Sequence, residues 1–200
     1  LKQKVEKMEP LFKRIIEEFY ANAKGVFEKV DEKSLQHIVS LITQVKKIYV
    51  LGIGHSGMFA RILSMKLNHV GLRAYTVFDE INPPIAKGDL FIAISQSGQT
   101  KTVIALVEKA KSIGSQVLGI SANADSTLAK ISDVFLRVDK KAEGVRFTAL
   151  SGIGEKKHEN LSGTLFGFNM YVLFYTLVIM IAQQRGETAE SIDARHQNLQ

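Results

Sequence analysis

The sequence contains no cysteine, and this absence excludes several kinds of chemistry. A disulfide framework, thiolate catalysis and a cysteine-ligated zinc site are all ruled out, and we expect a cytoplasmic protein. The N-terminus is rich in lysine and amphipathic from its first residues, so we expect no signal peptide. Internal repeats and low-complexity segments are also lacking. The 200 residues, 46% of them hydrophobic, are therefore predicted to form one domain around one core.

Strong charge clustering is absent as well. The formal net charge is +6, and the basic residues are spread through the chain without interleaved aromatic residues. This excess is compatible with a small anionic ligand, and it does not indicate a nucleic-acid partner. No residue cluster indicates a metal or a cofactor, so we expect neither.

Apolar runs alternate with amphipathic segments through the middle of the chain. The runs predict five strands, at 47–51, 73–78, 89–94, 116–120 and 134–138. The segments between them predict helices at 58–70, 101–113 and 126–131. This order specifies an α/β fold, a three-layer α/β/α sandwich around a five-stranded parallel sheet of the flavodoxin-like kind. In such sheets ligands bind at the carboxyl ends of the strands.

Helices are predicted on both sides of this core. Residues 1–45 would form two N-terminal helices, the first at 3–30 and the second starting at Asp31 to Ser34, and residues 46–140 would form the α/β core. Residues 141–200 would form a loop and C-terminal helices, the loop itself covering 139–162. Residues 165–182 are almost wholly apolar, but a membrane span needs about 20 such residues. We interpret this helix as buried between subunits, with no membrane contact. Its apolar face and that of residues 5–19 predict a homodimer or homotetramer.

The loop from Ser95 to Thr100 is the strongest functional signal. It joins a buried strand to an amphipathic helix, so it places free backbone N–H groups and the positive end of a helix dipole at the sheet edge. The hydroxyls of Ser95, Ser97 and Thr100 add donors, and Gly98 allows close approach to the backbone. These features predict a phosphate site. The alternative is that Ser97 merely caps the helix.

A second glycine-rich turn follows the first strand. Gly52, Gly54 and Gly57 match the G-x-G-x-x-G dinucleotide fingerprint, and Asp79 lies where a ribose-binding acid would stand. That fingerprint alone is a weak signal. Two donor-rich loops at neighbouring strand ends favour one phosphorylated small molecule over a dinucleotide.

Together the two loops resemble a known family. Gly52-x-Gly54-x-Ser56-Gly57 and Ser95-x-Ser97-Gly98-x-Thr100, with Ser126-Thr-Leu-Ala-Lys-x-x-Asp133, are similar to the sugar isomerase (SIS) domain. The segments 65–71 and 82–90 and the terminal Arg195-His196 are most similar to the 6-phospho-3-hexuloisomerase branch. The resemblance implies a homo-oligomer with sites shared between subunits. It also implies a set of residues that hold a sugar phosphate: Gly54, Ser56, Ser95, Ser97, Gly98, Gln99 and Thr100.

The resemblance also implies a catalytic glutamate that this chain lacks. That residue is expected after a Gly-Thr pair, here Gly163-Thr164, and the matching positions hold Gly167 and Phe168. His55 stands where the family usually has Arg or Lys. A base for isomerisation must then come from elsewhere. The candidates are His55, which we favour, and His69, His196, Glu159, Glu155, Asp79 and Glu80.

Each candidate also has a structural reading. Glu155 and Glu159 lie in a charged run that would ordinarily be solvated, and His69 would interact with a helix dipole. Three functions therefore stay open. The first is isomerisation of a phosphosugar through an enediol. The second is binding of a phosphosugar without catalysis, and the third, which we rank lowest, is dinucleotide-dependent oxidoreduction.

Overall fold

The computed structural model describes residues 10–148 and 158–196, with residues 158–163 described by their backbone only. Its centre is a parallel sheet of five strands in the order β2-β1-β3-β4-β5. These strands are β1 (Ile48–Gly52), β2 (Ala74–Thr76), β3 (Leu90–Ile94), β4 (Gln116–Ser121) and β5 (Val134–Arg137). Every residue of β1 and β3 is buried, as the continuous apolar runs predicted.

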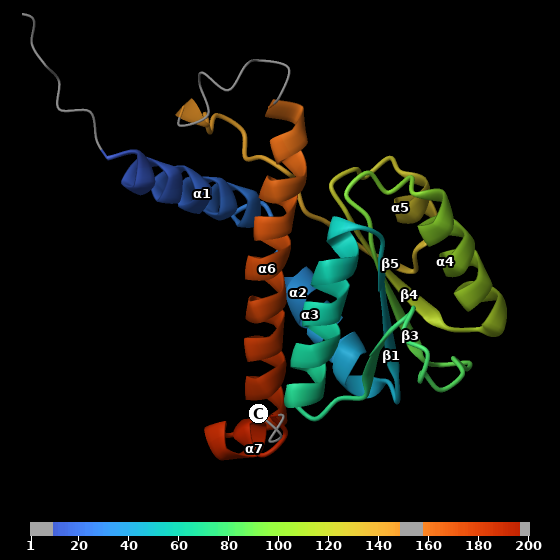
Figure 1. Cartoon of the computed structure of the whole chain (residues 1–200). Coiled ribbons are helices and arrows are strands. Elements are labelled where there is room, and N and C mark those ends of the chain that lie inside the picture. The colour runs from blue at the N-terminus through green and yellow to red at the C-terminus, as the bar shows by residue number, and fades with distance from the viewer. Residues whose placement is uncertain (1–9, 149–157, 197–200) are drawn as a thin grey trace, which may run out of the picture.

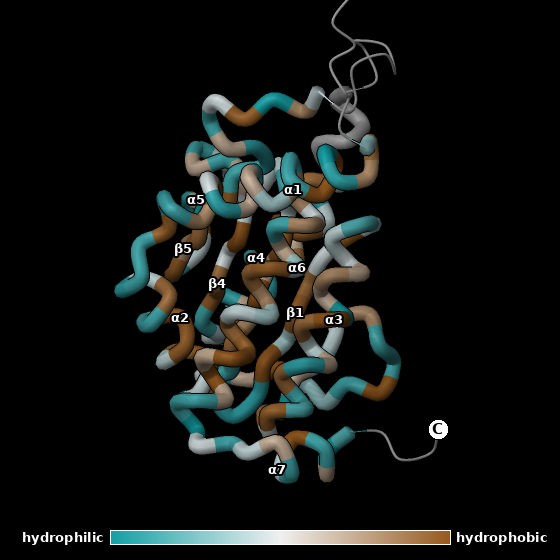
Figure 2. Tube along the Cα trace, turned by 90° about the vertical axis from the view of Figure 1, so that its left-hand side faces the viewer, coloured by the Kyte–Doolittle hydropathy of each residue, from teal (hydrophilic) through white to brown (hydrophobic). Residues whose placement is uncertain are grey.

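Helices cover both faces of the sheet (Figure 1). One apolar cluster joins the sheet to α2 (Glu32–Gln44), α3 (His55–His69) and α6 (His158–Arg185). On the other face a second cluster joins it to α4 (Lys101–Ile113) and α5 (Thr127–Ile131). In Figure 2 hydrophobic residues, drawn in brown, run along the strands of the sheet. The predicted three-layer sandwich with a parallel five-stranded sheet is confirmed.

The N-terminal helices differ from the prediction in their bounds. The helix α1 (Leu11–Phe27) begins only after Pro10 and ends three residues before the predicted limit of residue 30. Proline favours this position because its fixed φ suits the start of a helix and its missing N–H would have no partner there. Residues 3–9 of the predicted helix lie outside the described residues. The following helix α2 starts with Asp31 as its N-cap.

The helix α6 is longer than predicted. It begins at His158 rather than near residue 165, so the end of the predicted loop at 139–162 is helical. Among the described residues this is the one helix that is long and apolar enough to cross a membrane. It packs on α1, α2 and α3, and a buried row of its side chains belongs to the core: Phe166, Met170, Leu173, Phe174, Leu177 and Ile181.

A short C-terminal helix, α7 (Ala189–Asp193), folds back at the end of α3. The guanidinium groups of Arg185 and Arg195 donate to the carbonyls of Val70 and His69, at 3.0 Å in both cases. Both arginines also pair with Glu187, at 3.4 and 2.7 Å. The carbonyls at the end of α3 are thereby satisfied by side chains from the C-terminal segment.

Candidate functional site

The two signature loops meet where the chain changes direction along the sheet. From β1 the chain crosses by α3 to β2, and from β3 it crosses by α4 to β4, so α3 and α4 lie on opposite faces. Gly52 at the end of β1 pairs in register with Ile94 at the end of β3. The amino ends of α3 and α4 are therefore neighbours at the carboxyl edge, which is where doubly wound sheets bind their ligands.

The turn after β1 is built by glycines. A Cβ on Gly52 would lie 2.3 Å from the carbonyl oxygen of Ser56, so only glycine allows the first turn of α3 to pack against the end of the strand. Gly54 is the N-cap of α3 and has φ +59°. A glycine has no side chain with which to cap. In the first turn of α3 the N–H of Gly57 donates to the carbonyl of Gly54 at 3.0 Å, and no side chain caps the N–H groups that precede it.

The loop after β3 is held by its own hydroxyls. The buried Oγ of Ser95 lies 3.0 Å from Oγ1 of Thr100 and accepts a hydrogen bond from the Gly98 N–H at 3.2 Å. Gly98 has φ +64°, and a Cβ there would overlap Ser126. Ser126 in turn caps α5. The conformation of the loop is thus fixed by its own hydrogen bonds and by its contact with Ser126, without a ligand.

The alternative interpretation of Ser97 as a helix cap is wrong. The N-cap of α4 is Thr100, and no side chain makes the capping bond. Ser97 accepts instead from the N–H of Gln99 at 3.2 Å, within the loop itself. The amino end of α4, like that of α3, is therefore open to an anion.

A cleft of about 330 Å³ lies between these two helix ends. It is lined by Ile53, His55, Ser56, Ile94, Ser95, Gln96, Ser97 and Thr100. A second cleft of about 490 Å³ lies on the other side of the serine loop, where Ser97 and Gln96 form a shared wall. Arg137, the last residue of β5, and Lys140, in the segment that follows it, line this second cleft.

Comparison with known proteins identifies the family of this chain. The model of the SIS domain matches residues 41–152, which is more than half of the chain. The chain belongs to the SIS domain family. It is 32% identical to a 3-hexulose-6-phosphate isomerase of Methylomonas aminofaciens over 82% of this chain and 86% of the relative. It is 27% identical to the enzyme of that name in Bacillus subtilis, over 93% and 95% of the two chains.

A solved structure agrees with the fold. A hypothetical protein of Methanococcus jannaschii, whose crystal structure was described as inferring a molecular function of 3-hexulose-6-phosphate isomerase, superposes with a TM-score of 0.75. The two chains are 25% identical, and the match covers 92% of this chain and 98% of the other. This chain is thus an SIS protein whose relatives include hexulose-phosphate isomerases.

The predicted catalytic histidines are not brought together within one chain. His55 lines the first cleft, whereas His69 lies at the other end of α3, roughly 21 Å of helix away. His69 contacts His196 there, with ring centroids 4.3 Å apart. Burial, followed by the charges of His196 and Lys66, lowers the pKa of His69, which disfavours the cation that its place at a helix end suggested.

The predicted acidic residues lie outside the first cleft or outside the described side chains. Asp79 pairs with Arg61 of α3 at 3.3 Å, in a separate hollow beside β2. Glu159 lies in the first turn of α6 and not in a loop, which corrects the prediction, and its side chain is not described. Glu155 lies outside the described residues. In the described part of the chain, no three His, Asp or Glu residues are grouped as for a metal ion.

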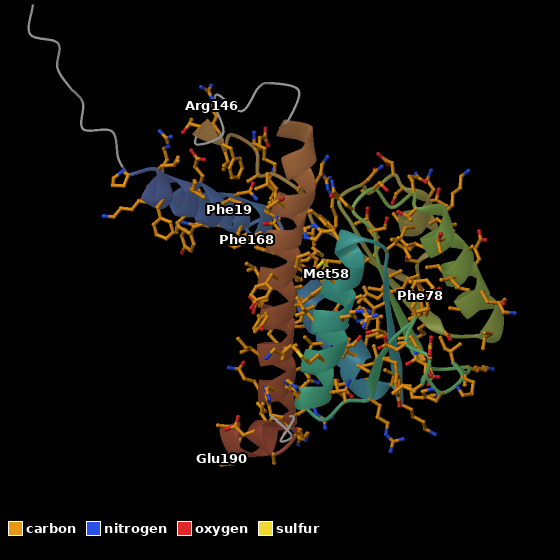
Figure 3. All side chains as sticks on the ribbon, viewed as in Figure 1. Phe19, Met58, Phe78, Arg146, Phe168 and Glu190 are labelled. Carbon is orange, nitrogen blue, oxygen red and sulfur yellow. The ribbon has the colours of Figure 1, made fainter. Side chains whose placement is uncertain are left out.

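The two positions that match the missing SIS glutamate point in different directions. Gly167 is buried against His55 and Phe59: a Cβ there would lie 2.9 Å from Cε1 of His55. Phe168 contacts Phe19 of α1, with ring centroids 5.2 Å apart, and the two labelled side chains meet between α1 and α6 in Figure 3. Of the two positions, only Gly167 adjoins the cleft. Sequence reasoning missed Phe59, whose only signal is its spacing of four residues from His55 on one helix.

Proposed function

We propose that this SIS protein is a phosphosugar isomerase acting on a hexulose 6-phosphate. The observation that carries the proposal is the convergence of two helix amino ends without side-chain caps on one cleft lined by Ser56, Ser95, Ser97 and Thr100. Backbone N–H groups, hydroxyl donors and two aligned dipoles form a site for a phosphate dianion. The names of its relatives support a hexulose phosphate as the phosphate-bearing molecule.

Within this proposal His55 transfers the proton. Its neutral ring nitrogen takes a proton from the carbon beside the substrate carbonyl, and the electrons of that C–H bond form the enediol double bond as the carbonyl oxygen gains a proton. The imidazolium then gives its proton to the former carbonyl carbon. The hydroxyl on the carbon that was deprotonated loses its O–H proton and becomes the new carbonyl, which balances the proton gained by the first carbonyl oxygen. The reaction needs no cofactor, because protons and electrons balance within the substrate and the imidazole.

His55 is the candidate that the fold supports best. The backbone of Glu159 lies about 12 Å before Gly167 along α6, towards the amino end of the helix. His69 and His196 would reach a cleft of this kind only in another copy of the chain, because they lie at the opposite end of α3. We propose that the protein works in the cytoplasm as a homo-oligomer, and the role of His55 does not depend on a second copy.

A deuterium experiment tests the proposal. The protein is incubated in D₂O with 3-hexulose 6-phosphate and, separately, with fructose 6-phosphate and with unphosphorylated fructose, and NMR follows exchange and conversion. We expect conversion of the two ketose phosphates, with deuterium entering at C2 of the 3-hexulose phosphate and at C3 of fructose 6-phosphate, and no reaction of fructose. Binding of the phosphates without exchange would favour the second candidate, a non-catalytic sensor, which the absence of a carboxylate at Gly167 supports. Nicotinamide dinucleotide binding in place of phosphosugar binding would overturn both.

A further inference from the structure

Gly167 lies inside a 28-residue helix, where glycine is unfavourable. A glycine in a helix interior lowers stability by roughly 0.5–1 kcal/mol relative to alanine, so we expect a packing constraint that excludes a side chain. The structure gives one. A Cβ at this position would lie 2.8 Å from both Cε2 and Cζ of Phe59, and 2.9 Å from Cε1 of His55. No side chain fits there unless one of those rings moves.

Phe59 contacts the same imidazole from its own helix. Its ring meets that of His55 edge to face, with centroids 5.0 Å apart and an interplanar angle of 62°. Phe59 is itself packed against the apolar core, so its position is fixed by the fold. The imidazole of His55 thus has Phe59 on one side and the backbone of α6 at Gly167 on another, and it also lines the phosphate cleft.

We propose that Gly167 and Phe59 are positioning residues that hold the His55 imidazole at the mouth of the phosphate cleft. This inference rests on the proposed function, in which His55 moves the substrate proton. The two departures from the SIS pattern, His55 and Gly167, then depend on each other. The imidazole occupies room that a side chain at 167 would need, and the proton-transferring group comes from the start of α3 in place of α6.

Positioning has a direct consequence for the rate. Proton transfer needs the ring nitrogen within hydrogen-bond reach of the substrate carbon's proton, and a shift of 1 Å can cost about 100-fold in rate. Gly167→Ala adds one methyl group that pushes on His55 or Phe59. Gly25→Ala is the matched control, because Gly25 is also a helical glycine, and a Cβ there would lie 2.7 Å from the Cβ of Ala142, away from the cleft.

Kinetics give the first readout. We expect Gly167→Ala to lower kcat by about 10-fold or more with little change in KM, because the phosphate site stays intact. Phe59→Leu should act in the same direction, and Phe59→Tyr, which keeps the ring, should retain most of the activity. In a His55→Gln background, Gly167→Ala should have no further effect on kcat. An independent loss in that background, or a loss equal to that of Gly25→Ala, would overturn the proposal.

A second readout does not require catalysis. The ring signals of His55 are followed by NMR in the free protein and during titration with inorganic phosphate. We expect a phosphate-dependent shift in the wild type and an altered starting position in Gly167→Ala and Phe59→Leu, but not in Gly25→Ala. If the wild type isomerises no ketose phosphate, the proposed function fails while these signals still report the placement of the ring. Unchanged His55 signals in both variants would refute the positioning role, whatever the activity.

Discussion

The amide groups of Asn22 and Asn169 face each other in the interior, with Nδ2 of Asn22 lying 3.4 Å from Oδ1 of Asn169. Both residues are fully buried. The Oδ1 of Asn22 accepts from the N–H of Ala142 at 2.9 Å, and Nδ2 of Asn169 donates to the carbonyl of Asp139 at 2.9 Å. The pair therefore ties the segment that leaves β5 to α1 and α6, and Lys140 in that segment lines the second cleft.

Breaking this pair should be costly for the fold. Asn22→Ala leaves the N–H of Ala142 and Oδ1 of Asn169 without their buried partners, and we expect the free energy of unfolding to fall by about 2–3 kcal/mol. Urea denaturation followed by circular dichroism measures this change. Asn123→Ala is the control, because its amide oxygen accepts one exposed local bond from Asp125, and we expect a loss below about 1 kcal/mol. Equal losses in the two variants would contradict the structural role of the pair.

Ser97→Ala tests the phosphate site without a change in the fold. Ser97 lines both clefts and is exposed, so its hydroxyl is available to a ligand. We expect binding of fructose 6-phosphate to weaken by about 1.5–3 kcal/mol, roughly 10- to 100-fold, since a hydrogen bond to a charged group is lost. Calorimetric titration measures it. Ser112→Ala, at the far end of α4, should leave affinity unchanged.

The phosphate interpretation also predicts selectivity in the unaltered protein. Fructose should bind far more weakly than fructose 6-phosphate, and Ser97→Ala should scarcely change the binding of fructose. If the two sugars bind the wild type equally well, the serine loop is not a phosphate site, and the proposed function fails with it.

Much of this site could be predicted from local sequence, because its loops are local structures. A buried apolar run followed by small polar residues and an amphipathic segment specifies strand, turn and helix wherever it occurs, and both loops follow that rule. The start of α6 could not be predicted in this way. Its first two turns, His158 to Thr164, are polar and carry no apolar periodicity, so they read as loop.

The contacts that matter most for mechanism are tertiary and leave little trace in the sequence. Gly167 meets His55 only because α6 packs across α3, and His69 meets His196 only because α7 folds back at the end of α3. Neither pair has a spacing that periodicity can detect. For the same reason the sequence favours His55 only through its place in the glycine-rich turn, and it does not predict that His69 lies at the other end of the same helix as a partner of His196.

Gly71 and Gly88 form a natural pair for testing the C-terminal segment. Both have positive φ, +76° and +82°, so alanine introduces similar backbone strain of about 1–2 kcal/mol at either position. A Cβ at Gly88 meets nothing within 4 Å, whereas at Gly71 it would lie 3.2 Å from Nη2 of Arg185 and from Cζ of Arg195. We expect Gly71→Ala to lose about 1 kcal/mol more than Gly88→Ala in urea denaturation. Equal losses in the two variants would contradict this prediction, because they would show that Arg185 and Arg195 move aside at no cost in stability.

Stability near His69 should depend on pH. The pKa of His69 lies below its ordinary value of 6.5, because burial and the positive charges of His196 and Lys66 disfavour the imidazolium. Two further charged groups lie nearby: Arg195, which donates to the carbonyl of His69, and Glu187, which pairs with Arg195. The unfolded chain therefore binds the proton at a higher pH than the folded chain does. Consequently the stability contribution is complete above about pH 6.5 and falls as the pH drops below it. His69→Gln should flatten the difference in unfolding free energy between about pH 7.5 and 5.5, and His37→Gln, an exposed control on α2, should not. An unaltered pH slope in His69→Gln would contradict this assignment.

The exposed face of α1 predicts self-association. Phe12, Ile16 and Tyr20 follow one another at four-residue intervals and are 74%, 55% and 71% exposed. Exposed apolar side chains of α6 continue the same kind of surface: Phe168, Tyr171 and Ile179. Apolar stripes of this extent mark interfaces, and the commonest partner of a soluble chain is a second copy of itself. We therefore expect a dimer or tetramer in light scattering at micromolar concentration.

A charged substitution on α1 tests this interface. Ile16→Glu should shift the protein to a smaller species, because a carboxylate on this stripe would have to be buried. Ile81→Glu is the matched control: Ile81 is 93% exposed and lies after β2, away from α1, so the same substitution should leave the mass unchanged. A wild-type protein that stays a soluble monomer, or equal behaviour of the two variants, would show that this face does not associate.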